Sequence, residues 1–172
     1  MSNKKYSKRQ IANIASDILR DYYGNDKYPI MVIELAKNIG LTVFKATFDR
    51  DDVSGMIEAQ EGIIYVSEND RINRQRFSIA HEIGHYALHY KGNLFEEKDN
   101  KQHISYRDSL SSLGFSIKEI EANFFAANLL MPEDKIKDLH HNGYDINQMA
   151  NFFGVSSIAI GHRLDFLGYE YE

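Results

Sequence analysis

The chain has 172 residues, of which 43 % are hydrophobic and 26 % charged, and its formal net charge is -5. This composition is typical of a folded globular protein, excludes a disordered one and argues against broad electrostatic binding to nucleic acid. The lack of cysteine excludes disulfides and thiolate chemistry, and the lack of an apolar signal segment or a ~20-residue membrane span predicts a cytoplasmic protein without membrane association.

The first predicted elements are helices. Apolar residues recur at helical spacing from Ile11 to Tyr22, and a second helix is expected between Pro29 and Gly40. Three strands are predicted next, at residues 41–44, 53–59 and 63–66, the last two joined by a hairpin turn. Helical spacing then returns and continues to the C-terminus. We therefore predict an α+β fold with N-terminal helices, a small, mostly antiparallel sheet with a hairpin, and a helical C-terminal segment.

The strongest signal for function is the sequence His81-Glu82-Ile83-Gly84-His85. Residues four apart stack on one face of a helix, so both imidazoles can reach one tetrahedral zinc ion. Glu82 is turned by ~100° from His81 and lies beside that ion instead of binding it. The alternative is a buried network of His and Glu hydrogen bonds without a metal.

The remainder of this helix supports a buried metal site. On a helical wheel Ser78, His81, Glu82, His85 and His89 fall within an arc of ~100°, and the other positions are almost all apolar. A stripe of titratable groups inside a core needs a compensating partner, and a metal ion is the simplest one. His89 lies ~12 Å along the axis from His81, too far for the same site. We expect it to support a ligand, to face the substrate or to form a hydrogen bond within the core.

A catalytic zinc ion takes three protein ligands and keeps one position open. Residues 119–130 offer two carboxylates for the third position. On the wheel of this helix Glu119 lies in the middle of a face of small and apolar residues, with Asn123 one turn further on. Glu121 lies beside Asn128, on the expected solvent side. A carboxylate directed into a core needs a partner, so we predict Glu119 as the third ligand and Asn123 as a residue that orients a ligand.

Two alternatives to Glu119 as a ligand stay open. Glu121 is the other candidate for the third position. In addition, Ser116 and Glu119 match a capping box, in which the Glu119 side chain would fold back onto the backbone of Ser116 at the start of the helix.

Two blocks of the sequence together resemble the ImmA/IrrE-type metallopeptidase family. Residues 76–89, which contain the His-Glu-x-x-His sequence, resemble its metal-binding helix. Residues 119–132 are similar to its second signature, Glu-x-x-Ala-Asn/Asp-x-Phe-Ala followed by Leu-Leu-Met-Pro. The hairpin at residues 53–66 also fits, so the resemblance covers roughly residues 29–132. It implies a thermolysin-like (gluzincin) zinc fold, in which a pair of helices binds the metal.

The resemblance implies the same site residues as the helical wheels. His81, His85 and Glu119 would bind Zn²⁺, one ion per chain, and Glu82 would be the general base. It further implies cleavage of a transcriptional repressor, typically that of an integrated mobile element or prophage. We therefore expect a zinc-dependent endopeptidase whose partner is a DNA-binding repressor. The alternative is a regulatory module that keeps a structural metal and binds a transcription factor or DNA without cleaving it.

Further residues are candidates for contacts with the substrate. Tyr65, His103 and Tyr106 can each donate a hydrogen bond to the oxyanion of a tetrahedral intermediate, and the sequence does not choose among them. The strand at residues 63–66 is expected to bind an extended peptide along the edge of the sheet.

We expect the chain to consist of a zincin-like metallopeptidase domain at residues 1–132 and a helical C-terminal segment at residues 133–172. The spacing of small and apolar residues around Gly154 is similar to that of a helix-turn-helix, with residues 156–163 as the recognition helix. That helix has a single arginine, so its phosphate contacts would be few. We favour a helical pair that packs on the core or docks the partner protein, and we do not expect direct binding to nucleic acid.

Overall fold

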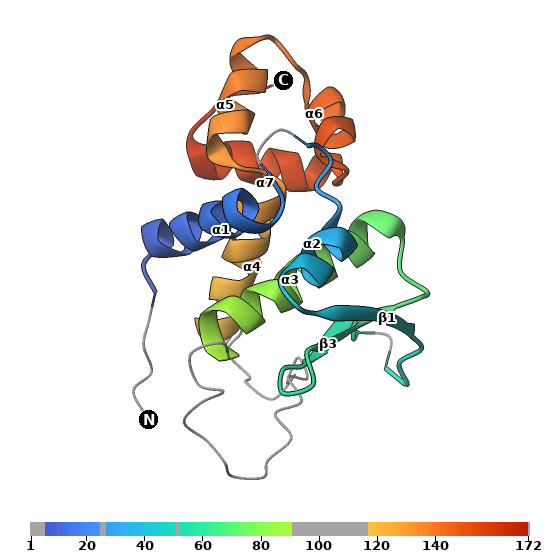
Figure 1. Ribbon diagram of the computed structural model, residues 1–172. Coiled ribbons are helices and arrows are strands. Elements are labelled where there is room, and N and C mark those ends of the chain that lie inside the picture. Colours follow the sequence, from blue (N-terminus) through green and yellow to red (C-terminus); the bar gives the residue numbers. More distant parts are fainter. Residues whose placement is uncertain (1–5, 25–26, 51, 91–116, 172) are drawn as a thin grey trace.

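The computed structural model describes residues 6–24, 27–50, 52–90 and 117–171. In chain order its first elements are α1 (Lys8–Tyr22), α2 (Val32–Asn38), β1 (Thr42–Ala46), β2 (Gly55–Glu58) and β3 (Ile63–Ser67). Then come α3 (Ile72–His85), the π-helical turn η1 (Tyr86–Tyr90), α4 (Ile117–Leu130), α5 (Glu133–His141), α6 (Ile146–Phe153) and α7 (Ser157–Leu167). The predicted α+β fold is confirmed (Figure 1). None of the described helices is long and apolar enough to cross a membrane.

The three strands form one sheet in the order β1-β3-β2. β2 and β3 are the predicted antiparallel hairpin, whereas β1 pairs in parallel with β3. The sheet is therefore mixed and not mostly antiparallel. The reason is the path of the chain, which crosses from β1 to the far edge of the sheet before it returns through the hairpin, so that β3 runs in the same direction as β1.

The central position of β3 corrects the expectation that residues 63–66 form a free edge. Both sides of β3 are taken by neighbouring strands, so its backbone has no row of donors and acceptors left for a peptide. Among the described strands β2 pairs only with β3, and its other side is an edge of the sheet.

One face of the sheet packs against α3 (Figure 1). Ile57 and Ile64 are directly opposite each other across the hairpin, and both are fully buried on this face. Gly55, opposite Val66, belongs to the same face. Because side chains alternate along a strand, Tyr65 belongs to the opposite face.

α3 and α4 come into close contact at Gly84. A Cβ atom at Gly84 would lie 3.0 Å from Cδ1 of Phe125 and 3.2 Å from the carbonyl oxygen of Ala122. Because those distances leave no space for a side chain, glycine lets the two helix backbones come close at the point where α3 carries its histidines. On the same helix Ile79, Ala80 and Ile83 are buried in the core, as expected for a helix that is apolar nearly all round.

The C-terminal helices pack on the rest of the chain. Arg76 on α3 donates from Nε to the carbonyl oxygen of Gly154 (2.9 Å), which lies between α6 and α7 with φ +63°. Arg163 on α7, only 3 % exposed, donates from Nε to the carbonyl oxygen of Met131 (3.0 Å). Phe153 and Ile160 are fully buried in the common core. The helical pair around Gly154 is thus present as predicted, and a domain boundary at residue 132 stays a prediction.

Candidate metal centre

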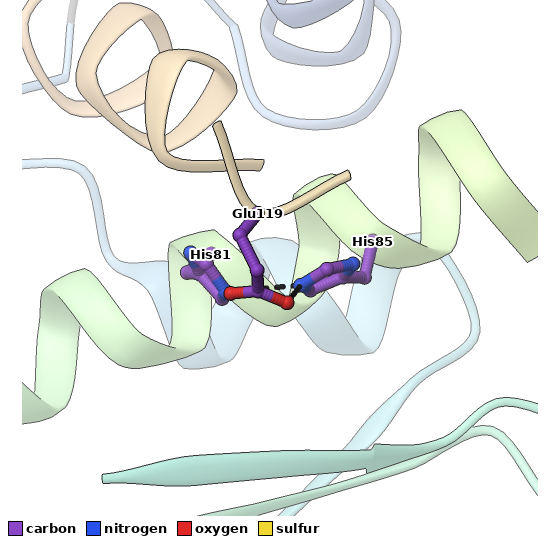
Figure 2. A group of neighbouring side chains, drawn as sticks. All are labelled: His81, His85 and Glu119. Atoms are coloured by element: carbon purple, nitrogen blue, oxygen red, sulfur yellow. Dashed lines mark hydrogen bonds and ion pairs between the residues drawn. The ribbon is translucent and has the colours of Figure 1, made fainter. Parts of the chain in front are cut away.

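Three side chains from α3 and α4 converge on one point (Figure 2). The Nε2 atoms of His81 and His85, one turn apart on α3, are 3.0 Å apart. Glu119, in the first turn of α4, brings Oε2 to 3.2 Å from His81 Nε2 and Oε1 to 3.1 Å from His85 Nε2. Both imidazoles are almost fully buried, and the Glu119 side chain is 18 % exposed. The cluster therefore lies between the two helices with one partly open side.

The donor set and its spacing fit a metal ion. Two imidazole nitrogens and one carboxylate form the protein ligand set of many catalytic zinc sites, in which a fourth position stays open. Ligand atoms ~2.0–2.1 Å from a tetrahedral zinc ion are ~3.3 Å from one another. The two Nε2 atoms are 3.0 Å apart, and a different oxygen of Glu119 lies 3.2 Å from His81 Nε2 and 3.1 Å from His85 Nε2, so each of these contacts is close to that spacing. His81, His85 and Glu119 can therefore hold a divalent ion without a rearrangement of the two helices.

Asn123 fixes the orientation of one imidazole. Its Oδ1 atom accepts a hydrogen bond from His81 Nδ1 at 2.9 Å. Because the proton is on Nδ1, the lone pair of the neutral ring is on Nε2, which faces the cluster. The structure thus places Asn123, one turn after Glu119, where the sequence predicted it.

The electrostatic environment keeps two of the side chains in their metal-binding protonation states. Burial lowers the pKa of His85, and the nearby Glu119 carboxylate offsets this only in part. Burial acts to raise the pKa of Glu119, but its interactions with the adjacent imidazoles of His81 and His85 outweigh burial and hold that pKa well below its usual value. At neutral pH the imidazole of His85 is therefore neutral and Glu119 is ionised, which are the forms that bind metals.

Glu82 is buried on α3 between the two histidines in sequence and is 4 % exposed. The start of β2 passes close to it. A Cβ atom at Gly55 would lie 3.3 Å from the Cβ atom of Ser78 and 3.5 Å from the Cγ atom of Glu82. The absence of a side chain at Gly55 therefore leaves space beside the Glu82 side chain. The strand pattern around Gly55 does not reveal this approach, because it contains no information about which helix packs against the strand.

Glu121 and Asn128 correct the sequence analysis, which placed them on the solvent side of their helix. They are 5 % and 7 % exposed. The chain before α1 covers one of them, since the backbone nitrogen of Tyr6 donates to Glu121 Oε1 at 2.7 Å. Arg163 on α7 covers the other, since its Nη2 donates to Asn128 Oδ1 at 2.9 Å. The far side of α4 is thus buried by polar contacts that the wheel could not reveal.

His89 forms contacts outside the cluster of three. It lies in η1, is 8 % exposed and donates from Nε2 to the carbonyl oxygen of Lys118 at 3.3 Å. Its Nε2 atom is 3.8 Å from Oε2 of Glu121. Of the roles considered for His89, the structure shows the hydrogen bond within the core.

Of the three candidates for contact with an oxyanion, the structure describes Tyr65, which is not brought to the cluster. Tyr65 belongs to the sheet face opposite to α3, and its hydroxyl lies 3.5 Å from Oε2 of Glu58. His103 and Tyr106 lie outside the described residues. Ser116, the partner of Glu119 in the possible capping box, also lies outside them. Glu119 itself is directed at the two histidines.

Comparison with known proteins identifies related sequences. Residues 36–165 match a peptidase family described as the IrrE N-terminal-like domain. The chain is 23 % identical over 169 residues to a Bacillus subtilis (strain 168) protein named metallopeptidase ImmA, and the alignment covers 95 % of this chain and 89 % of that protein.

A solved structure has a similar fold. It is that of a Mycobacterium tuberculosis transcriptional regulator, which superposes with a TM-score of 0.62 at 19 % sequence identity. The superposition covers 90 % of this chain and 46 % of the regulator. The chain thus spans about half the length of that protein, and the similarity is one of fold.

Proposed function

Because the chain belongs to the IrrE N-terminal-like peptidase family, we propose that it is a zinc-dependent endopeptidase with a specific protein substrate. The observation that carries this proposal is the convergence of His81, His85 and Glu119 within 3.2 Å of one another, with Glu82 on the same helix. The two-histidine, one-carboxylate set leaves one coordination position for chemistry.

In this proposal His81, His85 and Glu119 hold one zinc ion per chain. When bound, zinc polarises a carbonyl group and lowers the pKa of a water molecule at the open position. The protein prepares its ligands for this role. Asn123 holds the His81 ring with its lone pair toward the cluster, and the low pKa of Glu119 keeps that carboxylate ionised.

Glu82 acts as the general base. It accepts a proton from the attacking water and delivers it to the nitrogen of the leaving amine. Its side chain is buried, so bulk water competes little for its carboxylate. Gly55 leaves space beside Glu82, which gives the substrate backbone access to that carboxylate.

The geometry supports β2 as the strand that binds the substrate. Among the described strands β2 has one neighbour, β3, so its other edge can pair with an extended peptide. The edge begins at Gly55, where the strand approaches Ser78 and Glu82 on α3. A peptide added there would run alongside the proposed catalytic carboxylate.

We propose a DNA-binding transcriptional repressor of a mobile element or prophage as the substrate, and the resemblance to ImmA/IrrE-type peptidases supports this target. Such a substrate places the reaction in the cytoplasm. The C-terminal helices favour a protein partner over DNA. The single arginine within residues 156–163 is Arg163, which is 3 % exposed and bonded to Met131 and Asn128. It is not available to bind phosphate.

The test compares zinc-loaded protein with its Glu82→Gln variant in an extract of the source cells, with new protein N-termini identified by mass spectrometry. We expect cleavage of one or very few proteins, a repressor among them, by the native protein and by a Glu34→Gln control on α2. Cleavage should be absent with Glu82→Gln. Equal cleavage by Glu82→Gln would contradict the role of Glu82. If the zinc-loaded native protein cleaves no protein but still regulates the repressor, the protein is the non-proteolytic module.

A further inference from the structure

The face of α3 that carries the histidines continues toward the start of the helix. Arg74 is seven residues, or two helical turns, before His81, and it therefore lies on the same face, ~10 Å away along the axis. Ser78 lies between them, and its Cβ atom would be 3.3 Å from a Cβ atom at Gly55. This stripe therefore runs from the proposed metal ligands past the start of β2 to Arg74.

A hollow of about 340 Å³ opens on this stripe. It lies between the first half of α3, the residue before β2 and the N-terminal part of α7, and its described lining includes Ser54, Arg74, Phe77, Ser78, Val155 and Ala159. None of its described lining residues is acidic. Its size is at the lower end of ligand pockets, which fits one or two side chains of a peptide better than a large ligand. A peptide paired with the edge of β2 would pass this hollow as it leaves Gly55.

The guanidinium group of Arg74 is held by one nitrogen and presents the other two. Its Nε atom donates to Ser54 Oγ at 2.8 Å and lies 3.3 Å from Oδ2 of Asp70. No described residue forms a hydrogen bond with either of its η nitrogens. The side chain is 55 % exposed. A guanidinium anchored in this way presents a planar pair of donors, which match the two oxygens of a carboxylate.

We propose that Arg74 is a specificity-determining residue, which binds an acidic side chain of the polypeptide substrate within this hollow. The inference rests on the proposed endopeptidase function and adds a class of substrate to it. Phe77, Val155 and Ala159 provide the apolar wall for the methylene groups of an Asp or Glu side chain. The N-terminal part of α7 thereby becomes a wall of the substrate-binding site.

The experiment is a cleavage profile with a defined library. Peptides from a chymotryptic digest of a bacterial proteome, which keep both acidic and basic residues at internal positions, are incubated with zinc-loaded protein, and the residues around each cleaved bond are read by mass spectrometry. The native protein should show enrichment of Asp and Glu at one position near the cleaved bond. Arg74→Gln should lower kcat/KM for an acidic peptide by about tenfold or more, with little change for the same peptide with Gln at that position. Arg74→Glu should shift the preference to Lys or Arg.

Arg71→Glu is the matched control. Arg71 is an exposed arginine at the start of the same helix and does not line the hollow, so its variant should keep the native profile. Unchanged melting temperatures will show that each variant is folded. Cleavage without acidic enrichment, or an enrichment that persists in Arg74→Glu, overturns the role of Arg74 and leaves the endopeptidase function standing. If native zinc-loaded protein cleaves no peptide in the library and no protein in the cell extract, the endopeptidase proposal fails and this inference fails with it.

Discussion

His81 on α3 donates a hydrogen bond from Nδ1 to Oδ1 of Asn123 on α4, over 2.9 Å. This bond joins the helix that carries both histidines to the helix that carries Glu119. It also selects the tautomer of His81 that has its Nε2 lone pair directed at the cluster. This contact therefore links the two helices and fixes which nitrogen of His81 faces the cluster.

The first prediction concerns this contact. Asn123→Ala should weaken zinc binding about 10- to 100-fold, because the His81 ring loses the acceptor that orients it. Asn123→Asp keeps an acceptor at the same place and should retain most of the affinity. Zinc affinity measured by competition with a chelator provides the test. Asn151→Ala, on an exposed position of α6, is the control. Equal affinity in Asn123→Ala and the native protein would mean that packing alone orients the ring.

The second prediction concerns the close approach of α3 and α4 at Gly84. Gly84→Ala should destabilise the protein by about 1–3 kcal/mol, because the added methyl group meets Phe125 and the backbone of Ala122 at 3.0–3.2 Å. Chemical denaturation of the metal-free protein measures this. Gly161→Ala is the matched control in a helix, since its Cβ atom would meet only the hydroxyl end of Tyr171 at 3.2 Å. That variant should be neutral or more stable. Equal losses at the two sites would contradict the account of the α3–α4 contact.

The third prediction concerns the buried arginine of α7. Arg163→Ala should cost about 2–4 kcal/mol of unfolding free energy, because the carbonyl oxygen of Met131 and the Oδ1 atom of Asn128 both lose a charged donor. Thermal and denaturant unfolding measure the effect. Arg9→Ala, an exposed position on α1, should change stability by less than about 0.5 kcal/mol. Similar small effects for both variants would show that Arg163 does not hold the C-terminal helices in place.

The fourth prediction is an acid-dependent loss of stability in the metal-free protein. Burial lowers the pKa of His89 to about 4 from the ordinary 6.5. Between pH 4 and pH 6.5 His89 binds a proton in the unfolded chain but not in the folded chain. The free energy of unfolding is therefore highest above pH 6.5 and falls as the pH decreases toward 4. The contribution is at most about 1.4 kcal/mol per pH unit. His89→Gln should flatten the dependence of the unfolding free energy on pH. An identical slope in this variant would exclude His89 as its source.

The sequence allowed prediction of the parts that depend on local periodicity. The helix of His81 and His85 follows from its spacing, because residues on one helical face stay neighbours whatever surrounds them. The same reasoning placed Glu119 and Asn123 on the face that meets those histidines, without any knowledge of how the two helices cross.

The parts that depend on distant contacts could not be predicted in this way. A wheel separates Glu121 from Glu119 by an angle, but it does not show that Tyr6 covers the far side of α4. Strand periodicity likewise does not determine that β1 pairs in parallel with β3. A helical wheel that begins two turns earlier would have predicted that Arg74 shares a face with the histidines. It could not have predicted the hollow that Arg74 lines, because residues at the start of α7 form one wall of that hollow.

The most direct test of the central claim is the zinc content per chain of the native protein and of His85→Ala, Glu119→Ala and Glu121→Ala. We predict one zinc ion per chain in the native protein and in Glu121→Ala, and loss or strong weakening of zinc binding in His85→Ala and Glu119→Ala. If the native protein binds no zinc when the ion is supplied, or if Glu119→Ala keeps its full content, the proposed metal centre is contradicted.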